Sequence, residues 1–168
     1  MDGRQPDASP SSEQAARPLS KSVGDDGCAF DGPAISDAER AKVEAAITAL
    51  VEDFYGKARQ DDLLGPVFAA AVADWDGHLK TVADFWSHAL LKTQRYTGFP
   101  FPVHTQLPTL KPEHFPRWLA LFEESAAEIL PGDYAGQAIA RARHMARSFV
   151  AGVFPFTDKH GRPARKPG

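Results

Sequence analysis

Apolar residues recur at steps of three and four over most of the chain, which is the period of an amphipathic helix. The first such stripe follows a capping box, Ser36-x-x-Glu39, and runs to about Asp61. A second helix is predicted from Asp74 to about Lys92. No segment of the sequence alternates polar and apolar residues as a half-buried strand does, so the pattern predicts an all-α fold.

Two further helices are predicted in the second half of the chain, after a broken segment over residues 93–111. Prolines in that segment exclude a long regular helix, because each lacks an N–H and restricts the residue before it. Pro112 suits the first position of the third helix, which residues 131–133 end. The last helix covers residues 134–154, and a short apolar piece over 63–68 completes the predicted elements.

Both ends of the chain lack this periodicity. Residues 1–35 are rich in Ser, Pro, Gly and Asp and carry little apolar surface, which predicts a disordered N-terminal extension. Residues 157–168 are basic and contain Pro and Gly, which predicts a flexible tail. The helical domain between them, residues 36–156, is long enough to bury a core.

Composition narrows the classes of function. The chain has 168 residues, a formal net charge of −3 and one cysteine, Cys28. This charge gives no electrostatic reason to expect nucleic acid or an anionic membrane as a partner. A single cysteine excludes an internal disulfide and favours a reduced, cytoplasmic location. The sequence has no apolar run near the ~18–20 residues of a membrane span.

Motifs for nucleotide binding, for serine hydrolases and for helical zinc sites are absent from the sequence. What remains is a set of polar-tipped residues in apolar surroundings: Tyr55, His78, His104 and Trp118. Alone, each has a structural explanation, since core tyrosines and tryptophans are common and a histidine can cap a turn. Together they could hold a metal in a macrocycle through one neutral imidazole and surround a polar ligand opposite.

Several stretches also resemble the group III truncated haemoglobins. They are FYGKARQDDLLGPVF, a W-x-x-H with a second Trp eight residues after its histidine, YTGFPFPVHTQL, HFPRWLALFEES and RARHMARSFVAGVF. The resemblance covers residues from about 41 to 154, in order and without large gaps. It implies a shortened globin, in which two helices pack on two around haem b.

The resemblance also implies roles for single residues. His104 matches the proximal ligand of the haem iron and is expected to donate its other ring N–H to a backbone carbonyl. Tyr55 and Trp118 match distal residues that would donate hydrogen bonds to the ligand, and His78 matches a distal gate. The expected pocket walls are Phe85, Trp86, Phe99, Phe101, Phe115 and Leu119.

The implied function is binding of O2 and other diatomic ligands, namely NO, CO and, in the ferric state, cyanide. Sensing, detoxification of NO or reactive species, or redox chemistry is favoured over bulk O2 transport. NO dioxygenation or peroxidase-like turnover would need an external reductant, such as a reductase supplied in trans. Lys92 or Arg95 could pair with a haem propionate, and no motif decides between them.

The residues alone also allow a different class of function. The chain could be a non-haem helical interaction or regulatory domain, in which the aromatic stripe is core and residues 96–112 form a docking loop. A helical bundle of that kind needs neither a histidine fixed among prolines, His104, nor His78 on an apolar stripe. These two features favour the haem hypothesis.

Overall fold

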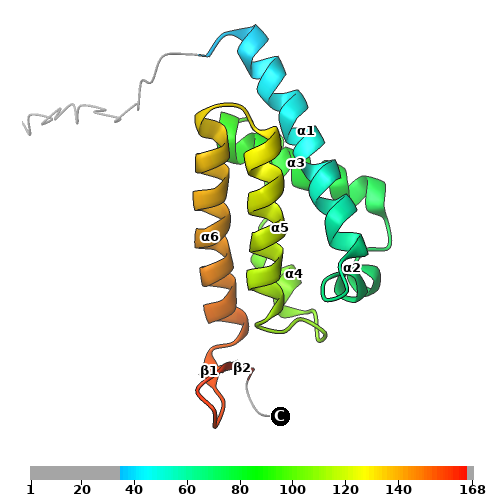
Figure 1. Cartoon of the computed structure of the whole chain (residues 1–168), viewed down its shortest axis with the longest axis vertical. Helices are drawn as coiled ribbons and strands as arrows, with labels where there is room; N and C mark the ends of the chain where they lie inside the picture. Colours follow the sequence, from blue (N-terminus) through cyan, green and yellow to red (C-terminus); the bar gives the residue numbers. More distant parts are fainter. Residues whose placement is uncertain (1–34, 166–168) are drawn as a thin grey trace, which may run out of the picture. The chain divides into compact units, whose positions relative to one another are not determined.

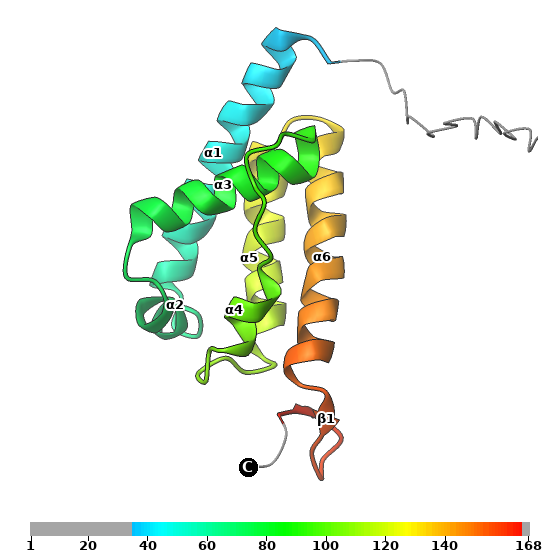
Figure 2. The ribbon, with the colours of Figure 1, turned by 180° about the vertical axis from the view of Figure 1, so that it is seen from behind.

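The computed structural model describes residues 35–165 (Figures 1 and 2). In chain order the elements are α1 (Asp37–Gln60), α2 (Gly65–Ala71), α3 (Trp75–Leu91), α4 (Phe101–Thr105), α5 (His114–Ile129), α6 (Asp133–Val153), β1 (Phe156–Thr157) and β2 (Pro163–Ala164). This confirms the predicted all-α fold. Within residues 35–165, no helix combines the length and the apolar character that a membrane crossing requires.

Helix α1 forms where the capping signal and the apolar stripe predicted it. The Ser36 hydroxyl accepts a hydrogen bond from the Glu39 N–H at 3.1 Å. At the other end, Asp61 Oδ1 accepts the N–H groups of Leu63 and Leu64, each at 3.0 Å. Asp61 also accepts a hydrogen bond from Arg117 Nε of α5 at 2.6 Å, which ties the end of α1 to that helix.

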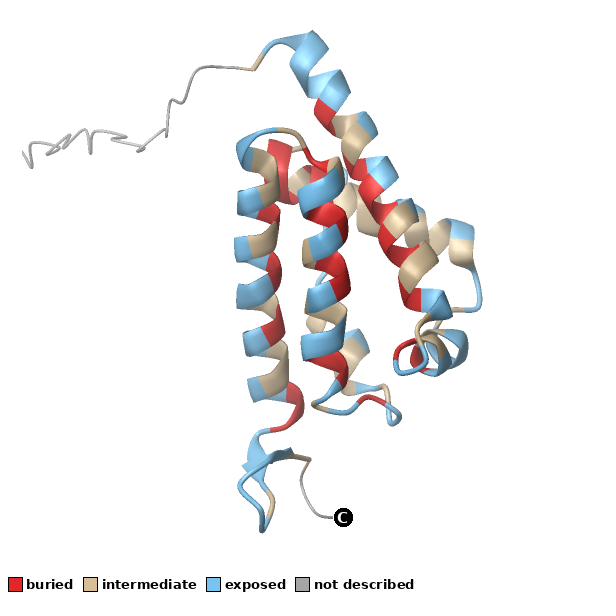
Figure 3. Cartoon of the chain, viewed as in Figure 1, coloured by how far each residue is buried: buried red, intermediate tan, exposed pale blue. Residues whose placement is uncertain are grey.

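The long helices form the two-on-two arrangement expected of a truncated globin. Helices α5 and α6 lie side by side, α1 packs against α3 and α5, and α3 also contacts α6 (Figures 1 and 2). Buried positions follow stripes along α1, α5 and α6, and the opposite sides are exposed (Figure 3). Trp86 of α3 stacks on Phe122 of α5 at 4.7 Å between ring centroids, so an aromatic contact joins the two layers.

The proline-containing segment differs in detail from its prediction. It contains the five-residue helix α4, and α5 begins at His114 with Glu113 as its N-cap. Pro112 therefore lies in the turn before α5, where its carbonyl accepts the Phe115 N–H at 3.3 Å, and its prediction as the first helical residue is wrong. Short turn bonds of this kind precede the regular helix.

The chain after α6 also differs from the predicted flexible tail. Phe156 pairs with Ala164 and Thr157 with Pro163 in an antiparallel hairpin. Asp158 Oδ1 accepts backbone N–H groups inside the turn, and Gly161 there has a positive φ of 78°. These local bonds build a hairpin whose strands are too short to show alternation. The N-terminal extension predicted over residues 1–35 lies, apart from Ile35, outside the described residues.

Candidate functional site

His104 lies on α4, and its ring is fixed by a hydrogen bond inside its own segment. Nδ1 is 2.9 Å from the backbone oxygen of Pro100. Because a carbonyl oxygen only accepts, Nδ1 carries the proton and Nε2 keeps a free lone pair. Burial lowers the pKa of His104, although the hydrogen bond to Pro100 opposes this. The imidazole is thus held in the neutral form that can ligate a metal.

Aromatic contacts dock α4 on α6. The His104 ring lies 4.6 Å from the ring of Phe149, and the Phe101 ring lies 5.7 Å from it. Gly152 allows this close approach, since a Cβ there would come within 2.4 Å of Phe101 Cζ. The sequence placed Phe149 on the buried face of the last helix but could not show that it supports His104, because spacing along one helix says nothing of what a distant segment contacts.

The side chains of Tyr55 and His78 contact one another. Their ring centroids are 5.0 Å apart with nearly perpendicular planes, and Trp75 lies 5.8 Å from each ring. Phe68 of α2 packs edge-on against Tyr55 at 5.4 Å. Burial raises the pKa of the Tyr55 hydroxyl far above neutral pH, so this group is a neutral hydrogen-bond donor. Three helices therefore fix one polar tip in an aromatic environment.

His78 carries the clearest sign of an unmet polar requirement. Its Nε2 is buried and has no hydrogen-bond partner among residues 35–165. An unsatisfied buried polar atom costs about 1–3 kcal/mol, so such atoms usually mark a ligand or another function. Burial is the main cause that lowers the pKa of His78, and His104 lowers it further.

Trp118 is connected to this group through the core. It stacks on Phe122 with centroids 5.1 Å apart and an interplanar angle of 3°. Phe54 lies edge-on to Trp118 at 5.4 Å and to Tyr55 at 4.8 Å, so one phenylalanine contacts both expected distal residues. The sequence identified Phe54 only as part of the apolar stripe of the first helix. Trp118 itself is half-buried.

The expected pocket walls divide into two groups. Trp86 is only 2% exposed and Phe115 only 7%, so both belong to the core and have little surface left for a cofactor. Phe99 is 73% exposed beside α4, and Phe101 and Leu119 are half-buried. Phe85 is also half-buried. The residues that keep free apolar surface are the ones that fit a planar apolar group: Phe85, Phe99, Phe101 and Leu119.

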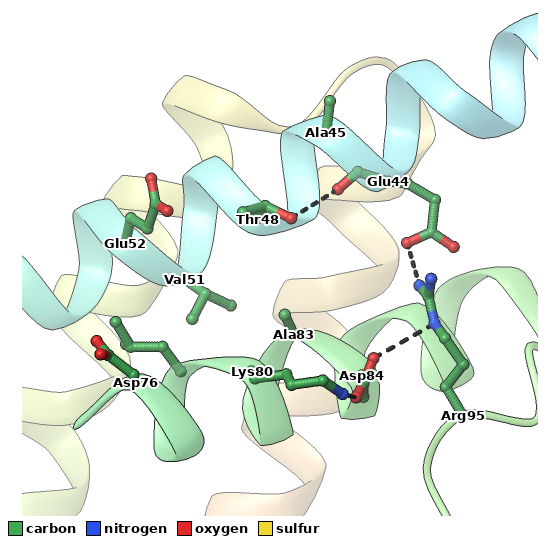
Figure 4. A pocket seen from close by; sticks show the side chains of 11 residues that line it. Glu44, Ala45, Thr48, Val51, Glu52, Asp76, Lys80, Ala83, Asp84 and Arg95 are labelled. Carbon is green, nitrogen blue, oxygen red and sulfur yellow. Dashed lines mark hydrogen bonds and ion pairs between the residues drawn. The ribbon is translucent and has the colours of Figure 1, made fainter. Parts of the chain in front are cut away.

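The two basic residues considered for a propionate have other partners. Arg95 pairs with Glu44 of α1 and, at 3.3 Å, with Asp84 of α3 (Figure 4). These contacts occupy its guanidinium on the side of α3 that faces α1. Lys92 ends α3 in the left-handed region at φ 58°, and its Nζ donates to the Ala89 carbonyl at 3.3 Å.

Two surface cavities lie outside the candidate site. One of about 520 Å³ runs between α1 and α3 and has a mostly charged lining (Figure 4). The other, of about 440 Å³, lies between the end of α3 and α6. Neither is lined by any of the four polar-tipped residues proposed from the sequence. Neither cavity contains an aromatic side chain other than His144, so the site is assigned from the buried side chains instead.

The fold and these side chains define a globin-type protein: a helical domain with a neutral, carbonyl-bonded histidine and a second, buried histidine nitrogen that has no partner among residues 35–165. No protein-family model matches the chain. A curated group 3 truncated haemoglobin of Campylobacter jejuni is 34% identical over 110 residues, which span 63% of this chain and 87% of that protein. The crystal structure of a group III truncated haemoglobin from Campylobacter jejuni aligns with a TM-score of 0.63 at 32% identity, covering 71% of this chain and 94% of that one.

The chain belongs to the group III truncated haemoglobins. Membership confirms the family resemblance drawn from the sequence and implies a haem cofactor.

Proposed function

We propose that this globin binds haem b through His104 Nε2 and takes O2, NO, CO or, in the ferric state, cyanide on the side of Tyr55, His78 and Trp118. The observation that carries the proposal is the buried Nε2 of His78, which has no hydrogen-bond partner among residues 35–165. A polar ligand within hydrogen-bond reach of this atom would meet this unmet requirement. When bound, haem supplies an iron centre that coordinates diatomic molecules and exchanges electrons.

Each of the four site residues has a distinct part in this proposal. His104 offers a neutral ring nitrogen, because its other nitrogen donates to Pro100. Tyr55 offers a neutral O–H, and the Trp118 indole offers an N–H donor only. A hydrogen bond in a dry pocket is worth on the order of 1–2 kcal/mol, or roughly tenfold in affinity. His78 can admit the ligand or bond to it.

A pocket rich in hydrogen-bond donors slows ligand release, which favours sensing, detoxification of NO or reactive species, or redox chemistry over bulk O2 transport. NO dioxygenation and peroxidase-like turnover are the enzymatic forms of this proposal. Both need electrons from outside the domain, and a reductase acting in trans is the partner we propose. We propose a cytoplasmic location, which the single cysteine favours.

Haem titration tests the proposal. Purified protein should give a Soret band that saturates at stoichiometric haem, and His104→Ala should lose the six- or five-coordinate spectrum of the wild type. His144→Ala is the matched control, because His144 is exposed on α6. Added imidazole should restore the spectrum of His104→Gly. A protein without Soret absorption after haem addition would support a non-haem helical domain, and an unchanged spectrum in His104→Ala would remove the proximal assignment.

A further inference from the structure

The C-terminal hairpin ends against the segment that carries His104. Arg165 follows β2 directly, and its guanidinium donates two hydrogen bonds to backbone oxygens of this segment. Nη1 is 3.2 Å from the oxygen of Thr105, and Nη2 is 2.6 Å from that of Leu107. Both acceptors lie within three residues of His104 in the sequence, and the hairpin lies at the same end of the domain as α4 (Figure 2).

Helix α4 needs external support of this kind. It has only five residues, Phe101–Thr105, and isolated helices of that length are unstable in water. The last carbonyls of any helix lack intrahelical donors. A cation at the C-terminal end of a helix is also favourable, because the backbone dipoles leave partial negative charge there.

The guanidinium of Arg165 is placed for this contact rather than for solvent. Its carbon lies 5.3 Å from the ring centroid of Phe154, which follows α6. Its Nε is buried without an acceptor in the part of the chain that the structure describes. Arginine is rarely buried without compensation, so the two carbonyl bonds and the aromatic contact are what hold it there.

We propose that Arg165 is a positioning residue for His104 and, through it, for the iron–histidine bond; this rests on the proposed function of His104 as the iron ligand. Arg165 fixes the carbonyls that follow His104, so the end of α4 cannot fray. A fixed α4 keeps His104 Nδ1 at its 2.9 Å hydrogen bond to Pro100. That bond sets the ring orientation and the electron donation of Nε2.

Resonance Raman spectroscopy of the ferrous, ligand-free haem protein tests this role, because the iron–histidine stretching band reports the bond directly. Arg165→Ala should lower the frequency of this band and broaden it. Arg165→Lys should restore part of the shift, since an ammonium can still bond one carbonyl. Arg162→Ala is the matched control, because Arg162 lies in the same hairpin and pairs there with Asp158 at 2.9 Å. Its band should equal that of the wild type.

Hydrogen exchange of the haem-free protein gives an independent readout. Amides of residues 104–107 should exchange faster in Arg165→Ala than in the wild type and the Arg162→Ala control. Far-UV circular dichroism checks that each variant folds. Arg165→Gln, whose side chain is shorter, is the second variant should Arg165→Ala not fold, and the same shift and faster exchange are expected.

The two proposals fail in different ways. If the wild-type band persists in His104→Gly without imidazole, the assignment of His104 as ligand is wrong. If the band depends on His104 but keeps its frequency and width in Arg165→Ala and Arg165→Gln, the positioning role is overturned and His104 stays the ligand. Unchanged exchange of residues 104–107 in both variants would also overturn it.

Discussion

The two sides of the candidate site are built in different ways. Tyr55, His78 and Trp118 lie on helices of 24, 17 and 16 residues, whose apolar faces form the main core. His104 lies on a helix of five residues, which a few contacts from α6 and the C-terminal hairpin hold in place. The distal side should therefore lose its structure only when the whole domain unfolds. The proximal side should respond to small local changes that leave the rest of the fold intact.

The largest effect on stability is expected from Phe122→Ala, which removes a ring from the core that supports the distal side. Phe122 is 1% exposed and stacks on both Trp86 and Trp118. Removing a buried aromatic ring costs about 3–5 kcal/mol of the free energy of unfolding, measured by urea denaturation. Phe99→Ala is the control, because Phe99 is 73% exposed and its loss should cost less than about 0.5 kcal/mol. Similar costs for both would contradict the proposed division.

The next largest effect is expected on the rate of ligand release from the distal side, in variants that keep the core intact. Tyr55→Phe and Trp118→Phe should each speed O2 dissociation about tenfold, because each removes one hydrogen-bond donor worth about 1–2 kcal/mol. Stopped-flow measurement of the dissociation rate checks this. Tyr134→Phe, at the start of α6, should leave the rate unchanged. Unchanged rates in both distal variants would exclude these donors from ligand binding.

Two glycines of α6 sharpen the comparison on the proximal side. Gly136 has nothing within 4 Å of an added Cβ, so Gly136→Ala should stabilise the protein by about 0.5–1 kcal/mol through helix propensity. A Cβ at Gly152 would lie 2.4 Å from Phe101 Cζ. Gly152→Ala should therefore displace Phe101 and destabilise by about 1 kcal/mol, the lower range for overpacking. Chemical denaturation measures both, and equal stabilisation would show that Phe101 does not anchor α4.

The same division explains how far sequence reasoning reached. The long helices, their buried faces and the Ser36 cap could be predicted, because periodicity and capping are local properties. The hydrogen bond of His104 to Pro100 is local as well, because the two residues are only four positions apart. The bonds of Arg165 to Thr105 and Leu107 join positions about 60 residues apart, and no pattern within one segment contains such contacts.

The resemblance to a family had its own limit. It selected Trp86 as a pocket wall, which stays a prediction, and it gave no indication that this ring stacks on Phe122 and is only 2% exposed. A family motif records which residue types recur, but it does not record how much of a side chain the core leaves free. The buried Nε2 of His78, which has no partner among residues 35–165, likewise depends on tertiary packing, which sequence spacing cannot give.

The smallest expected effect is a pH dependence that lies outside both sides of the site. His114 begins α5, is 5% exposed, and accepts the Lys111 N–H at Nδ1 over 3.0 Å. Burial lowers the pKa of His114 below its ordinary value of about 6.5. The unfolded chain then binds more protons than the folded one below about pH 6.5, so the free energy of unfolding falls as the pH falls.

His114→Asn removes this titration and keeps a side-chain acceptor for the backbone N–H. Between pH 7.5 and 5.5 the variant should lose less stability than the wild type, by up to about 1 kcal/mol, since one pKa unit corresponds to about 1.4 kcal/mol. His160→Asn, an exposed hairpin residue, is the control and should leave the slope unchanged. Burial lowers the pKa of His78 and His104 as well, so a residual slope is expected. If His114→Asn keeps the full slope, the acid sensitivity lies with these two histidines, and haem binding, which engages His104, should then reduce it.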